Sequence, residues 1–79
     1  MSSLLILPDG SAFSYKTRIL HVTAEGLKIG NVTRYSKTTS GHQHRVGVFE
    51  AQIRLDKVER GTTDLLKLAI DRGLVEESK

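Results

Sequence analysis

Histidine and hydroxyl side chains are the residues of this chain whose types and spacing could do chemistry. His42 and His44 are separated by one residue within the polar segment 36–44, and His21 offers a third imidazole. Three such ligands can hold zinc and leave one coordination position open. However, two histidines among Ser, Thr, Gly and Gln are more typical of a solvated loop, and the chain has no cysteine. We therefore predict neither a metal site nor a cofactor.

Nucleophilic catalysis has even less support in the sequence. The hydroxyl side chains nearest to these histidines are Ser36, Thr38, Thr39 and Ser40. A catalytic triad needs a base held rigidly by a third group, together with donors for an oxyanion. A polar loop supplies neither, and segment 26–30 lacks the glycine spacing of a phosphate-binding loop. We predict that the protein is not an enzyme.

The distribution of charge indicates a class of partner. Residues 16–45 contain six Lys or Arg residues and one acidic residue, a net charge of +5 in a chain whose total is +3. Cations displace counterions from phosphates, while hydroxyl and amide groups donate hydrogen bonds to phosphate oxygens. Tyr35 is predicted to be an exposed aromatic ring that stacks on a base, and histidines become cations in mildly acidic solution. The candidate site residues are Lys28, Arg34, Tyr35, Lys37, His42, His44 and Arg45.

The leading prediction is a small non-enzymatic binding module that contacts nucleic acid through this basic central surface. The alternative is a protein-binding inhibitor or adaptor that acts on a larger nucleic-acid-processing complex, as small proteins of mobile elements often do. It would place its basic loop against an acidic protein surface, or pair a sheet edge with a partner strand. Phosphates and carboxylates attract the same cations, and an ordinary solvated loop has a similar composition, so the sequence leaves these readings open.

Chain length limits the protein to one domain, residues 1–79. Small domains bury a low fraction of their surface, and without cysteine no disulfide can compensate, so a homodimer remains an open expectation. No basic start precedes a long apolar run, and the apolar residues 4–7 are too few for a signal peptide or a membrane span. We expect a cytoplasmic protein that makes no membrane contact.

The elements that position the candidate residues begin with β-strands. Residues 3–7 are an apolar run closed by Pro8-Asp9-Gly10, which predicts a buried strand and a hairpin. The β-branched segment 17–23 predicts the next strand, and another follows from Leu27. Gly30 inside that pattern predicts a bulge.

The second half of the chain is predicted as a loop, a strand and a helix. Segment 36–44 has no apolar residue and predicts a long, mobile polar loop. Residues 45–56 are the clearest strand, with a bulge near Gly47. Its inward residues are Phe49, Ala51, Ile53 and Leu55. The broad apolar side of residues 62–72 predicts a helix, and Thr62 is its expected N-cap.

These elements predict an α+β domain. We expect a strongly bent antiparallel sheet of four or five strands, with a single C-terminal helix packed across one face. A small barrel of the SH3 or OB type with an added helix is the alternative. The basic residues come from separate strands and a loop, so the functional prediction requires that the fold bring them to one face.

Overall fold

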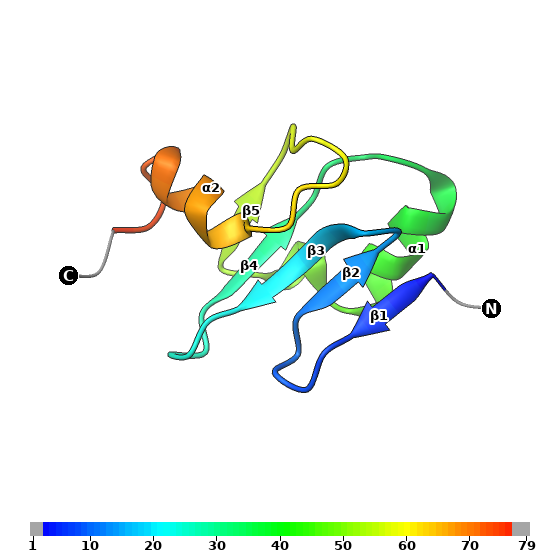
Figure 1. Cartoon of the computed structure of the whole chain (residues 1–79), viewed down its shortest axis with the longest axis horizontal. Coiled ribbons are helices and arrows are strands. Elements are labelled where there is room, and N and C mark those ends of the chain that lie inside the picture. The colour runs from blue at the N-terminus through cyan, green and yellow to red at the C-terminus, as the bar shows by residue number, and fades with distance from the viewer. Residues whose placement is uncertain (1–2, 77–79) are drawn as a thin grey trace.

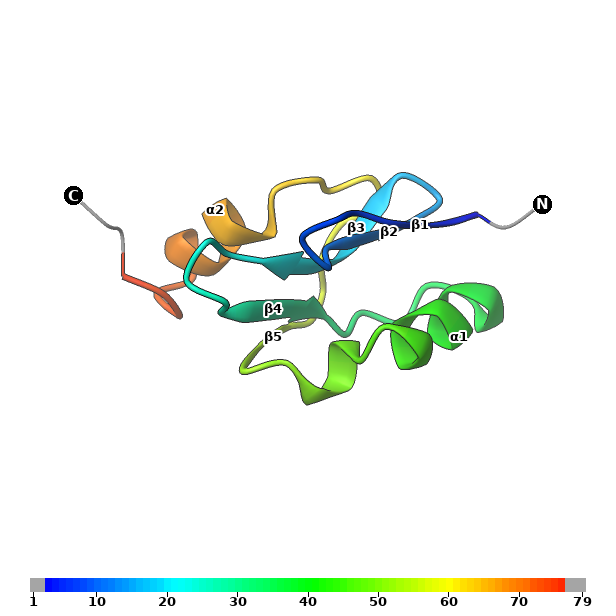
Figure 2. The ribbon, with the colours of Figure 1, turned by 90° about the horizontal axis from the view of Figure 1, so that it is seen from below.

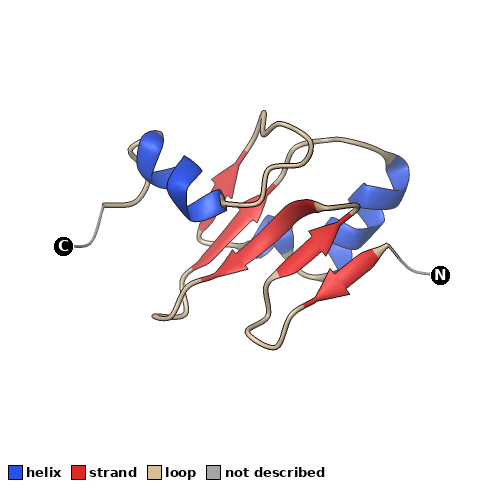
Figure 3. Cartoon of the chain, viewed as in Figure 1, coloured by secondary structure: helices blue, strands red, loops and turns tan. Residues whose placement is uncertain are grey.

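A five-stranded sheet with an α-helix on each face makes up residues 3–76, the part of the chain that the structure, a computed structural model, describes (Figures 1 and 2). The strands are β1 (Leu4–Ile6), β2 (Ala12–Ser14), β3 (Thr17–Val22), β4 (Lys28–Asn31) and β5 (Ile53–Leu55). The helices are α1 (Lys37–Arg45), the 3-10 helix η1 (Val48–Glu50) and α2 (Leu65–Asp71), as coloured in Figure 3. No helix in this range is long and apolar enough to cross a bilayer.

The first four strands pair as antiparallel hairpins, as the turn sequences predicted. In the β1–β2 turn the Asp9 carboxylate accepts the N–H of Ser11 at 2.8 Å, and Gly10 takes a positive φ of 95°. The β2–β3 turn consists of Tyr15 and Lys16, both in left-handed conformations that suit the twist of a hairpin. The α+β class and the strand count are therefore confirmed.

The prediction of a purely antiparallel sheet is wrong in one place. The strands lie in chain order from β1 to β5, but β5 runs parallel to β4. A parallel neighbour requires a crossover connection, and residues 32–52 supply it with α1 and η1. The sheet is open, with edges at β1 and β5, so the barrel alternative does not hold for the described residues. At the β1 edge Leu5 and Ile6 are 56% and 53% exposed, which corrects the expectation of a buried first strand.

The predicted mobile loop 36–44 is also wrong, because most of it forms α1. The Ser36 hydroxyl accepts the N–H of Thr39 at 3.1 Å and so caps the first turn. His44 and Arg45 lie in the last turn, where positive charge favours the helix dipole. Gln43 and Thr39 face the sheet and are buried. The sequence has no apolar residues at helical spacing that would predict this helix, because the side that contacts the sheet is polar.

Only the end of the predicted strand 45–56 is a strand. Gly47 takes a φ of 76° just after α1 and ends that helix, so the bulge expected there does not exist. η1 follows, and β5 covers only Ile53–Leu55. The alternating pattern was misleading because Phe49 lies in η1, while Ala51 and Leu55 belong to two separate apolar cores.

The C-terminal helix packs on one face of the sheet, as predicted, although α2 is shorter than residues 62–72. Its N-cap is Asp64, whose carboxylate accepts the N–H of Lys67 at 3.0 Å. Thr62, the expected cap, instead donates its hydroxyl proton to the carbonyl of Glu59 at 2.6 Å.

Two small apolar cores lie on opposite faces of the sheet (Figure 2). The core under α2 contains Ile29, Leu55, Val58, Leu65 and Ala69. The core on the side of α1 and η1 contains Ala12, Ile19, Leu20, Val48 and Ala51. Successive residues of β4 point to opposite faces, so Ile29 joins the first core while Gly30 faces Val48. A Cβ at residue 30 would collide with the Val48 carbonyl oxygen, and this close approach explains the glycine better than the predicted bulge does.

Candidate ligand site beside helix α1

The structure separates Lys28 from the other predicted site residues. β4 begins at the end of the sheet remote from α1 (Figure 1), and Lys28 is its first residue. Arg34 follows the other end of the same strand, six positions later, which corresponds to as much as about 20 Å of extended chain. Lys28 is therefore not part of the surface around α1.

Tyr35 is not the exposed stacking residue that the sequence predicted. Its ring is half-buried, and its hydroxyl donates to the Val58 carbonyl at 2.6 Å. The same hydroxyl accepts the side-chain amide of Asn31 at 2.9 Å. The Arg60 guanidinium lies over the ring, 5.2 Å from its centroid. Tyr35 thus joins β4 to the segment that follows β5, and one face of its ring is covered.

His42 faces the sheet and attaches α1 to β2. Its Nδ1 lies 2.7 Å from the Ser14 hydroxyl, which in turn lies 3.1 Å from the hydroxyl of Thr39. Ser36 completes this chain by donating to Thr39 at 3.2 Å. Ser14 is only 1% exposed, so the pair cannot present a nucleophile to a substrate. Its geometry is that of a polar attachment between helix and sheet.

The third histidine lies on β3, and the three imidazoles do not converge. His21 accepts a hydrogen bond from Arg18 at Nδ1, 3.0 Å away. Burial, together with the Arg18 charge, lowers the pKa of His21 and favours its neutral form. Among residues 3–76 no group of three His, Asp or Glu side chains is placed to hold a metal ion.

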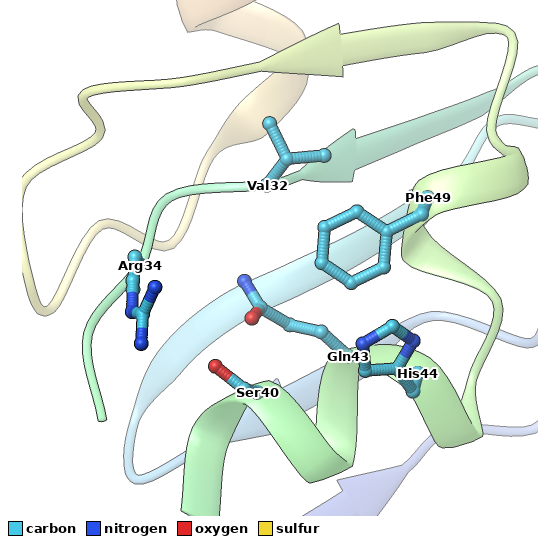
Figure 4. A pocket seen from close by; sticks show the side chains of 6 residues that line it. All are labelled: Val32, Arg34, Ser40, Gln43, His44 and Phe49. Carbon is cyan, nitrogen blue, oxygen red and sulfur yellow. The ribbon is translucent and has the colours of Figure 1, made fainter. Parts of the chain in front are cut away.

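Two of the predicted residues, Arg34 and His44, line a pocket of about 280 Å³ between α1, η1 and the end of β4 (Figure 4). The other lining residues are Val32, Ser40, Gln43 and Phe49. The His44 and Phe49 rings are tilted against each other with centroids 4.7 Å apart. The sequence indicated Ser40 and Gln43 only as polar neighbours of the basic residues, within a supposed loop. It did not indicate Val32 and Phe49, which were assigned to strand patterns.

Three cations on or beside α1 have no acidic partner in the part of the chain that the structure describes. Arg34, Lys37 and Arg45 are exposed, and none of them forms an ion pair within the described residues, where Lys67–Asp71 is the only one. Lys37 and His44 are seven positions apart on α1 and therefore lie on the same side of the helix. Arg45 adds a charge at the helix end. Five of the seven predicted residues thus lie on or beside α1, although His42 faces the sheet.

Comparison with protein family models, with curated proteins and with solved structures found no match for this chain. The pocket itself carries the functional argument. Its apolar side is formed by Val32 and Phe49, and its polar side by Ser40, Gln43 and His44, with Arg34 at one end (Figure 4). No carboxylate lines it. Such a lining suits the binding of a planar group joined to an anion.

Proposed function

We propose that this protein is a non-enzymatic module that binds single-stranded nucleic acid along α1, with one base in the pocket described above. The observation that carries the proposal is a pocket with an aromatic wall and with Arg34 in its lining. It lies beside a helix whose Lys37 and Arg45 form no ion pair within the described residues. Phosphates would contact the cations, and a base would contact Phe49 or His44. Recognition of this kind is typical of single strands, whose bases are free to leave the stack.

The size of the pocket favours a single base. Pockets for larger ligands usually occupy about 300–1,000 Å³, and this one, at about 280 Å³, is smaller. Bases in a duplex are stacked and paired, so a duplex base would have to flip out to enter this pocket. The proposed ligand is therefore RNA or DNA without secondary structure. We further propose that binding takes place in the cytoplasm and needs no cofactor.

Salt-dependent binding tests the proposal. We would measure the affinity for a labelled single-stranded oligonucleotide across a salt series, for the wild type and for the double variant Arg34→Ala/Lys37→Ala. Each lost phosphate contact should lower the slope of log affinity against log salt by about 0.7 on a single strand. Both side chains are exposed, so folding should be unaffected.

The matched control is Lys28→Ala/Lys67→Ala, which removes two exposed cations far from the pocket. It lowers the net charge by the same amount and should keep most of the affinity and slope. Equal losses in the two double variants would show that only total charge matters. Absence of binding by the wild type at low salt would overturn the proposal.

A protein partner is the second candidate function, favoured by the exposed apolar residues of the first hairpin. Leu5 is 56% exposed and Tyr15 is 49% exposed. A second pocket of about 360 Å³ lies beside Leu5, lined by Ser3, Leu5, Phe13, Lys16 and Thr63. The Tyr15 ring instead lies near His42, with the ring centroids 6.0 Å apart. An extended segment of a partner could lie along the β1 edge, with an apolar side chain in this pocket and a carboxylate near Lys16. In this case the protein would act as an inhibitor or adaptor of a nucleic-acid-processing complex.

The substitution Leu5→Lys separates the two candidates. It places a charge in the hairpin pocket and should leave oligonucleotide affinity unchanged if α1 carries the function. Sedimentation of the wild type over a concentration series reports whether the same edge pairs two copies of the chain. Loss of oligonucleotide binding in Leu5→Lys, with folding intact, would move the proposed site from α1 to the hairpin.

A further inference from the structure

Gln43 is the residue of the α1 pocket whose side-chain orientation is fixed by its surroundings. It is 1% exposed, and its Nε2 donates to the backbone carbonyls of Asn31 at 2.7 Å and Thr33 at 2.9 Å. A carboxamide nitrogen has two N–H donors, and a carbonyl can only accept. The opposite orientation would place the amide oxygen against two carbonyl oxygens. The nitrogen therefore faces β4 and the segment after it.

This orientation directs the Gln43 oxygen away from β4. Figure 4 shows Oε1 on the side of the amide toward Ser40. Within the part of the chain that the structure describes, Oε1 accepts no hydrogen bond. Because no side-chain N or O atom buried in the described residues lacks a partner, Oε1 must be open to water in the pocket. A ligand that displaces this water leaves the acceptor unpaired unless it offers a donor, which is costly. The pocket is thus an acceptor site whose position is set by two backbone contacts.

If the protein binds single-stranded nucleic acid as proposed, on which this inference rests, the pocket also restricts which base is bound. The ligand must offer an N–H group to Gln43 while its ring lies against Val32 or Phe49 and its phosphate reaches Arg34. Cytosine and adenine carry an exocyclic amino group at the edge where thymine and uracil carry a carbonyl oxygen. A carbonyl placed there would face the Gln43 oxygen as acceptor against acceptor. We infer that the pocket selects cytosine and adenine, whose amino group lies at this position, through the Gln43 oxygen.

Changes in the ligand test this inference without disturbing the fold. We would compare oligomers of deoxycytidine, deoxyuridine and N4,N4-dimethyldeoxycytidine of one length, at the same salt concentration. The dimethylated base keeps the ring and the charge of cytosine but has no amino hydrogen. We expect about tenfold weaker binding of the deoxyuridine and dimethylated oligomers than of oligo(dC).

The outcomes distinguish the inference from the function on which it depends. Equal affinity for all three oligomers would overturn selection by the amino group and leave single-strand binding intact. Failure of all three to bind at low salt would overturn the proposed function itself. Tighter binding of oligo(dU) than of oligo(dC) would also overturn the inference, because the pocket would then prefer a base with a carbonyl group.

A measurement at the residue itself complements the affinities. The chain contains two glutamines, Gln43 and the exposed Gln52, whose side-chain amides can be followed by NMR in the wild-type protein. Addition of oligo(dC) should shift the Gln43 amide resonances and leave those of Gln52 unchanged. Oligo(dU), at a concentration giving the same fractional saturation, should shift the Gln43 resonances less. Equal shifts with the two oligomers would count against a hydrogen bond to the base.

Discussion

The two α-helices lie on opposite faces of the same sheet and are attached to it by different forces (Figure 2). α2 buries Leu65 and Ala69 completely. α1 contains no apolar side chain, and Thr39, His42 and Gln43 attach it to the sheet through hydrogen bonds. Apolar contact is non-directional and stabilises the fold, whereas hydrogen bonds depend on direction and fix the position of side chains. The candidate site lies on the helix that is held by directional contacts.

The intrinsic helix propensities of the residues in α1 add to this difference between the two helices. α1 includes Thr38, Thr39 and Gly41, residue types that weaken a helix, and an isolated segment of nine residues would be marginal in water. Its helical form therefore depends on the Ser36 cap and on the contacts with β2 and β4. We expect α1 to open locally with less free energy than the α2 core, because local stability follows buried apolar contacts.

Removing the main apolar contact of α2 should have the largest effect on stability. Leu65→Ala should lower the free energy of unfolding by about 2–5 kcal/mol, since Leu65 is fully buried and its loss leaves a cavity. Denaturant unfolding measures the change. Leu74→Ala is the control, because that side chain is 48% exposed and its truncation should cost only about 0.5 kcal/mol or less. Similar losses in the two variants would show that α2 does not anchor the fold.

The same contrast explains which helix could be predicted from the sequence. The apolar residues of α2 recur with helical spacing, and Gly73 follows at a φ of 73°. α1 offers no such period, because Thr39 and Gln43, its two buried residues, are polar. Their partners are the Ser14 hydroxyl and the backbone carbonyls of β4 and the residues after it, which composition does not reveal. A polar helix and a polar loop therefore look alike in sequence.

The candidate site was predictable only in its charges. Arg34 and His44 belong to a basic stretch, and charge can be counted without a structure. Gln43 and Phe49 reach the pocket because the crossover to β5 brings α1 and η1 together, and β5 is only three residues long. So short a strand does not show whether it runs parallel or antiparallel. The pocket consequently depends on a topology that local patterns do not specify.

Breaking the polar attachment should have a smaller and more local effect than Leu65→Ala. Ser14→Ala removes the hydroxyl that contacts both Thr39 and His42, at a cost of about 1–3 kcal/mol. Hydrogen exchange should accelerate at the amides of α1 and remain slow in α2. The comparison variant Ser36→Ala removes the N-cap and the hydrogen bond from Ser36 to Thr39 but leaves the contact between Ser14 and His42, at a cost of about 1 kcal/mol. Equal acceleration in both helices would mean that the molecule opens as one unit.

On the α2 side, acid should weaken the contact between β3 and the segment that leads into α2. Arg18 donates to the Thr63 carbonyl and to His21, and burial lowers the pKa of His21 below its usual 6.5. The unfolded chain therefore binds this proton at higher pH than the folded chain does. The contribution to stability is complete above about pH 6.5 and is lost as the pH falls through the folded pKa.

The difference in unfolding free energy between the wild type and His21→Gln, measured at several pH values, isolates this contribution. Gln keeps an acceptor within reach of Arg18 and does not titrate. The wild type should lose stability relative to the variant below about pH 6.5. A difference that does not vary with pH would show that His21 has the same affinity for protons in both states.

The smallest effect is expected from a substitution that stabilises α1 and leaves its contacts with the sheet unchanged. Gly41 is exposed, and a Cβ at this position would meet no atom within 4 Å. Gly41→Ala should therefore stabilise the helix by about 0.5–1 kcal/mol, because alanine loses less backbone entropy on folding. If α1 is the less stable of the two helices, its amide exchange should slow while that of α2 stays the same. If exchange does not slow in α1, or slows only in α2, the polar attachment already holds α1 as firmly as apolar packing holds α2.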